Sequence, residues 1–103
     1  MKKVILHVSY HCKSEKDAGD FVRAIKASGV QGTVRAEDGC EQYDYHISCE
    51  QPDTVVLLER WRDIEALQAH MAQPHMATIR SIKDEFVAES YVERYTTQDT
   101  EIK

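Results

Sequence analysis

Two strand-like runs joined by a short polar turn dominate the middle of the sequence. The first, 40–50, alternates aromatic or apolar residues with polar ones, and the second, 54–61, is rich in apolar residues. Pro52 and Asp53 lie between them, and proline cannot donate a backbone hydrogen bond into a sheet. We therefore expect two antiparallel strands, of which the second is covered on both faces because it is so nearly continuous in apolar residues.

The N-terminal run 3–12 shows a similar alternation and indicates a further strand. One face of this strand carries mainly apolar side chains and is a plain core face. The opposite face is half polar, and its members are Ile5, His7, Ser9 and His11. A half-polar face is unusual in a sheet that is covered on both sides, so we expect helices against the first face and a ligand cavity against the second.

Capping residues mark two helical regions. Ser14 precedes apolar residues at helical spacing that continue almost to Gly29, and Asp63 precedes a second such stretch. Pro74 cannot lie inside a regular helix without the loss of a hydrogen bond. We therefore expect a break one or two residues before it and a new helix after it, since proline is favoured in a first helical turn.

A short helical piece at 30–37 and a last strand at 90–97 complete the order β-α-β-β-α-β. This order is the ferredoxin-like arrangement of the α+β class, in which four antiparallel strands carry helices on one face. The 103 residues fit a single domain, 1–103, that ends in a polar tail, 98–103. No residues remain to cover the other face of the sheet, so we expect a symmetric homodimer in which a second copy covers it.

Charge and cysteine content restrict the partners and the location. The net charge is −5 and no block of lysine and arginine stands out, which argues against a nucleic acid or an anionic membrane surface as partner. No apolar run reaches the roughly 18 residues of a membrane-spanning helix. The three cysteines are an odd number without a secretory segment, which indicates reduced thiols and a cytoplasmic protein.

Several short motifs follow one another in order between residues 39 and 76. They are Gly39-Cys40, Tyr43-Asp44, Pro52-Asp53-Thr54, Glu59-Arg60-Trp61, Glu65-Ala66-Leu67, Ala69-His70 and Pro74-His75-Met76. Together they resemble the antibiotic biosynthesis monooxygenase (ABM) domain family. The resemblance implies a dimeric α/β barrel in which two sheets meet, usually with a pocket in each subunit.

Many enzymes of that family act on quinols or polyphenols without metal or flavin, and the resemblance implies a small aromatic substrate of this kind. The phenol is deprotonated and its anion reacts with dioxygen, so the protein supplies a base, donors for negative charge and a dry pocket. We expect no cofactor, and the chain has no Gly-x-Gly-x-x-Gly motif for a dinucleotide. We also expect no metal site, because His70 and His75 are five residues apart and helical ligand pairs are three or four apart.

Histidine suits the role of base because its unperturbed pKa of about 6.5 lies near working pH. We predict that His7, which would point into the uncovered face of the sheet, and His70, at the edge of a helical stripe, are catalytic. The predicted substrate-binding residues are Trp61, Tyr45, Glu59, His46 and His75. Structural roles are the alternative: Trp61 as a core aromatic residue, and His7 as a hydrogen-bonding residue of the dimer interface.

Two other functions fit the same resemblance. One branch of the family isomerises a small phosphorylated carbonyl compound, which requires cations, and Arg60, Arg62 and Arg80 are available for the phosphate. The other alternative is a ligand-binding or stress-response dimer without turnover. Haem degradation is not expected, because the resemblance places the iron-ligating histidine of that branch at about Arg80, and a protonated guanidinium cannot ligate iron.

Overall fold

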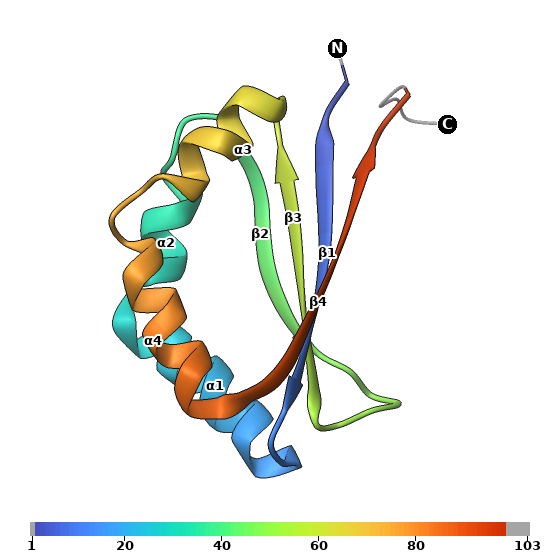
Figure 1. The fold of residues 1–103 in the computed structure, drawn as a ribbon, viewed down its shortest axis with the longest axis vertical. Helices are drawn as coiled ribbons and strands as arrows, with labels where there is room; N and C mark the ends of the chain where they lie inside the picture. Colours follow the sequence, from blue (N-terminus) through green and yellow to red (C-terminus); the bar gives the residue numbers. More distant parts are fainter. Residues whose placement is uncertain (1, 99–103) are drawn as a thin grey trace.

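The computed structural model describes residues 2–98 and packs the helices against one face of a four-stranded sheet (Figure 1). The strands are β1 (Val4–Cys12), β2 (Cys40–Ile47), β3 (Thr54–Trp61) and β4 (Val87–Thr96). The helices are α1 (Glu15–Ser28), α2 (Val30–Arg35), α3 (Ile64–Met71) and α4 (Met76–Phe86). The strand order is β2-β3-β1-β4 and every neighbouring pair is antiparallel. The predicted ferredoxin-like α+β fold is therefore confirmed.

The helix ends follow the local chemistry of the sequence. The Ser14 hydroxyl accepts a hydrogen bond from the backbone N–H of Asp17 at 3.0 Å, and Gly29 ends α1 in the left-handed conformation, with φ 77°. The Asp63 carboxylate accepts from the backbone N–H of Ala66 at 2.9 Å and starts α3. That helix ends at Met71, before Pro74, as expected.

Three boundaries differ from the sequence prediction by two or three residues. The short helix α2 ends at Arg35 rather than at residue 37, β2 ends at Ile47 rather than at residue 50, and β4 begins at Val87 rather than at residue 90. In these places no capping or turn residue in the sequence marks where regular hydrogen bonding begins or ends. The predicted polar tail lies, apart from Gln98, outside the described residues.

The hydrophobic core lies between the sheet and the helices. Phe21 of α1 is fully buried, and its ring meets Tyr10 of β1 and Tyr45 of β2 edge-on at centroid distances of 5.2 and 6.0 Å. Trp61 at the end of β3 is 0% exposed and belongs to this core. The alternation of buried and part-exposed residues along β1 shows that its apolar face is the one under the helices, as predicted.

The other face of the sheet has no helix on it in the part of the chain that the structure describes (Figure 1). This open face carries His7 and His11 of β1, the outward residues of β3, and Tyr91 and Tyr95 of β4, whose side chains are 60% and 51% exposed. Within residues 2–98, no helix is both long and apolar enough to span a membrane.

Candidate functional site

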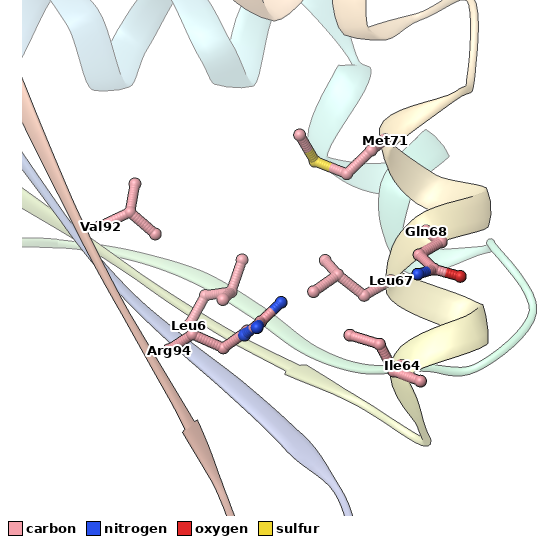
Figure 2. Close-up of a pocket in the computed structure, with 7 residues that line it drawn as sticks. All are labelled: Leu6, Ile64, Leu67, Gln68, Met71, Val92 and Arg94. Atoms are coloured by element: carbon pink, nitrogen blue, oxygen red, sulfur yellow. The ribbon is translucent and has the colours of Figure 1, made fainter.

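Two adjoining hollows lie between the helix-covered face of the sheet and the helices α3 and α4. The outer hollow has a volume of about 440 Å³, and Figure 2 shows the side chains of α3 facing those of β1 and β4 across it. It is lined by Leu6, Ile64, Leu67, Gln68, Met71, Val92 and Arg94. The inner hollow, of about 170 Å³, shares Leu6, Met71 and Val92 with it. Its polar lining includes Tyr10, Tyr43, Glu59 and His70.

Glu59 and Trp61 are presented to this side of the sheet by the two-residue period of β3. The indole N–H of Trp61 donates to Oε1 of Glu59 at 3.0 Å, and Glu59 itself is only 5% exposed. Burial raises the pKa of the Glu59 carboxyl, because a charged group is costly where water is excluded, although the indole hydrogen bond opposes this shift. Glu59 is therefore a carboxyl group held in one orientation at the wall of the inner hollow.

His70 of α3 is stacked on Trp61. The ring centroids are 4.5 Å apart with the planes tilted by 31°, and His70 is 1% exposed. Its Nε2 lies 4.0 Å from Oε1 of Glu59, which is too long for a hydrogen bond. Since Glu59 lines the inner hollow, Nε2 is the imidazole nitrogen on that side.

The other nitrogen of His70 is bound to Glu37, which lies in the loop after α2. Oε2 of Glu37 is 2.8 Å from Nδ1 of His70 and 2.7 Å from Nε2 of His75. A carboxylate only accepts hydrogen bonds, so each facing nitrogen carries the proton. In a neutral His70 ring, Nε2 then carries no proton and can accept one beside the inner hollow. The ring is held in this orientation by the Glu37 carboxylate at Nδ1 and by the stacked Trp61 indole.

Buried tyrosines supply hydrogen-bond donors around this centre. Burial raises the pKa of Tyr45 to about 12 and also raises the pKa values of Tyr10 and Tyr43, so all three stay protonated phenols. The Tyr45 hydroxyl donates to that of Tyr43 at 3.4 Å, and the Tyr43 ring stands edge-on to His70 at 5.9 Å. Tyr10 and Tyr43 line the inner hollow directly.

Two cations of α4, Arg80 and Lys83, also line the inner hollow. Neither forms an ion pair with a carboxylate within residues 2–98. The other arginines proposed for phosphate are placed elsewhere. Arg62 is held by Asp38 and Asp63, and Arg60 lies on the open face opposite Ile5.

The model of a family described as antibiotic biosynthesis monooxygenase, ABM, matches residues 4–81. The chain belongs to the ABM family. It is 36% identical over 52 residues to "Probable quinol monooxygenase YgiN" of Escherichia coli K12, a match that covers 43% of this chain and 50% of YgiN. The chain thus spans about half the length of that relative.

A second relative is "Putative monooxygenase Rv0793" of Mycobacterium tuberculosis, with 38% identity over 65 residues, 63% of this chain and 62% of Rv0793. The solved structure of Rv0793 superposes with a TM-score of 0.78 and 28% identity, over 95% of this chain and 97% of that one. A "putative antibiotic biosynthesis monooxygenase" from Deinococcus radiodurans superposes with a TM-score of 0.82 over 96% of both chains. Its 21% identity supports the fold alone.

Five of the seven site residues predicted from the sequence of this ABM protein lie in one cluster. They are Tyr45, Glu59, Trp61, His70 and His75. His7 and His46 do not join it, because they lie opposite Leu58 and Val56 on the open face. His7 faces the uncovered side of the sheet, as predicted, and a cavity on that side stays a prediction that involves the second copy. The hollows with His70 lie on the other side, under the helices, where the inward residues of β1 are Leu6 and Val8.

Glu37 was not identified from the sequence, because it is 33 residues away from His70 and lies in an irregular loop. The one signal in the sequence that could have pointed to Glu37 is the turn residue Gly39. Its φ is +86°, and a Cβ at this position would lie 2.5 Å from Cβ of Ala66 in α3. Only a glycine lets this loop approach α3 so closely, and that approach brings Glu37 to His70.

Proposed function

We propose that this ABM protein is a cofactor-independent monooxygenase that acts on a quinol or polyphenol with dioxygen. The observation that carries the proposal is the Glu37–His70 pair, whose free Nε2 borders a hollow lined by aromatic side chains. The name of the relative YgiN, a probable quinol monooxygenase, supports the substrate class. The adjoining outer hollow is mostly apolar, and its volume of about 440 Å³ suits a flat aromatic molecule.

In the proposed reaction, Nε2 of His70 accepts the proton of a substrate phenol. Glu37 stabilises the imidazolium that forms, because its carboxylate already accepts a hydrogen bond from Nδ1. The phenolic O–H groups of Tyr10 and Tyr43 are donors for negative charge that develops on the substrate. Apolar walls exclude water, and the electron-rich anion then reacts with dioxygen itself.

We also propose that the molecule is a homodimer in which a second copy covers the open face. Half-buried apolar residues of β1 and β3 and the exposed rings of Tyr91 and Tyr95 support this assembly. Nε of Arg60, on the same face, is buried and has no hydrogen-bond partner within the described residues. A partner across a two-fold axis could supply one.

Oxygen uptake with a hydroquinone tests the proposed reaction. The variant His70→Ala is expected to lower the rate by about 10²- to 10⁴-fold, the usual contribution of a general base. The matched control is His11→Ala, because His11 lies on the opposite face of the sheet from His70 and pairs with Asp53 at 3.1 Å. Equal rates in His70→Ala and wild type would contradict the assignment of the base.

Arg80 and Lys83, which form no ion pair among the residues that the structure describes, favour a second candidate, an isomerase of a small phosphorylated carbonyl compound. A phosphate beside these side chains would place the carbonyl carbon chain near His70, which could move a proton along it. Turnover of such a compound without oxygen, sensitive to Arg80→Ala, would favour this function. A protein that binds aromatic ligands but turns over neither substrate class would be the non-catalytic dimer.

A further inference from the structure

Three potential metal ligands converge behind the inner hollow. Nδ1 of His70, Nε2 of His75 and a carboxylate oxygen of Glu37 all lie within 4.8 Å of one another. We propose that these three residues form a binding site for a divalent transition-metal ion of the Zn²⁺ type. The site is separate from the hollows, since it uses the nitrogen of His70 that faces away from them.

The chain break at Pro74 creates this convergence. A spacing of five residues would place His70 and His75 on different sides of one continuous helix. The helix α3 instead ends at Met71, α4 begins at Met76, and His75 lies in the connection between them. The two imidazole centroids are therefore only 6.5 Å apart. The third ligand, Glu37, arrives from the loop that Gly39 presses against α3.

The chemistry of the three donors fits this class of ion. Two imidazole nitrogens and one carboxylate oxygen are ligands that zinc and its neighbours accept, and three protein ligands leave a fourth position for water. The side chains of Glu37 and His75 are 10% and 19% exposed, while that of His70 is 2% exposed. The ion would therefore enter from the His75 side and bind against a ring already fixed by Trp61.

A rearrangement of Glu37 and His75 is needed for the ion to enter. The Glu37 oxygen is now 2.7 and 2.8 Å from the two nitrogens, which are hydrogen-bond lengths, and the three ligand atoms together lie within 4.8 Å of one another. Around a tetrahedral zinc ion with bonds of about 2.0–2.1 Å, ligand atoms are about 3.3 Å apart. The carboxylate must therefore withdraw by about half an ångström, and His75, which lies in the connection between the helices, must bring its nitrogen closer to that of the fixed His70 ring.

Metal binding changes which nitrogen of His70 carries the proton. A neutral imidazole that coordinates through Nδ1 holds its proton on Nε2, so the nitrogen beside the inner hollow becomes a donor. No proton leaves the ring; it moves from one nitrogen to the other. If His70 is the base proposed above, and only then, an ion at this site switches the reaction off.

Titration of the metal-free full-length protein with Co²⁺ tests the site. We expect one equivalent to give the visible absorption of a four-coordinate Co²⁺ ion and to be displaced by Zn²⁺. The variants His75→Ala and Glu37→Gln should weaken binding at least about tenfold, because each removes one of three ligands. His75→Gln provides a check on folding, since its amide can still donate to Glu37. The control His11→Ala should bind like wild type.

No stoichiometric binding, or equal binding in wild type, His75→Ala and Glu37→Gln, would overturn the proposal. Nitrogen NMR of the histidine rings gives a second readout that does not depend on activity. Zn²⁺ should move the His70 proton from Nδ1 to Nε2 in wild type, and this movement should be absent in His75→Ala. If wild type takes up no oxygen with any quinol, the proposed function fails, while the binding data still decide the metal site.

Discussion

The two sides of the sheet have similar residue types in opposite surroundings. On the helix side, His70 of α3 is 1% exposed, stacked on Trp61 and held by Glu37. On the open face, His11 has a side chain that is 52% exposed and pairs with Asp53 at 3.1 Å. Residue type alone therefore does not mark a reactive histidine here. The fixed ring orientation and the exclusion of water distinguish the covered one.

The tyrosines show the same contrast through their pKa values. Burial raises the pKa of Tyr45 on the covered face to about 12. On the open face, the pKa values of Tyr91 and Tyr95 are raised mainly by hydrogen bonds that their hydroxyls donate to Glu89 and Glu93, at 2.6 and 2.8 Å. The first cause is the burial of the ring in the core, whereas the second is a contact between neighbouring side chains of one strand.

The largest expected difference between the faces is in stability. Trp61→Ala should lower the free energy of unfolding by about 3–5 kcal/mol, because it leaves a cavity and removes the support beneath His70. The exposed pair of His11 and Asp53 should contribute no more than about 1 kcal/mol, so His11→Ala is the matched comparison. Urea unfolding measures both variants, and similar losses would mean that the covered face is not the core.

A smaller effect is expected at the carboxylate behind the histidine. Glu37→Gln should lower the rate of oxygen uptake by about 10- to 100-fold, as for other residues that orient a reactive histidine. Because the neutral amide of this variant would not stabilise the imidazolium, the rate should also depend on pH differently from wild type. A pH–rate profile separates this positioning role from a purely structural one, which would leave the profile unchanged.

The next prediction concerns Gly39, whose close approach to α3 brings Glu37 to the covered face. Gly39→Ala should cost about 1–3 kcal/mol, because its φ of +86° disfavours a side chain and the new Cβ would meet Ala66. Gly29→Ala is the control, since it has a similar φ of +77° but nothing within 4 Å. Thermal unfolding of both variants measures how much stability the contact between the new Cβ and Ala66 costs. Equal losses of stability in the two variants would show that this contact with α3 costs nothing beyond the strained φ.

The smallest expected effect is in the rate of cysteine alkylation, which should also differ between a buried and an exposed position. Burial raises the pKa of Cys12 to about 11, and this residue is 2% exposed, whereas Cys49 is exposed. The reactive thiolate of Cys12 becomes common only as the pH approaches that value, so Cys49 should be alkylated first at about pH 8. Mass spectrometry of timed iodoacetamide reactions gives the order, and early labelling of Cys12 would indicate frequent opening of the core.

The fold was predicted well from the sequence, because the features that fix the helix ends and the strand faces act over a few neighbouring residues. Ser14, Gly29 and Asp63 act through contacts with their own helix, and the alternation along β1 identifies the apolar face. The site was predicted only in part. His7 was expected in it because a half-polar strand face resembles a cavity wall, although the same pattern suits a face that another surface covers. Glu37 was missed because no local pattern links it to a helix 33 residues away.

Met71 borders both hollows, and its side chain is 60% exposed. A thioether side chain has several rotatable bonds and adopts different shapes at little cost. The two hollows adjoin at Met71, Leu6 and Val92, the three residues that line both of them. Of these three side chains Met71 is the most adaptable, so its rotamers should adjust the room for bulky ring substituents without movement of the backbone. Exchange for a stiff β-branched residue would narrow the range of accepted molecules and leave the reacting groups untouched.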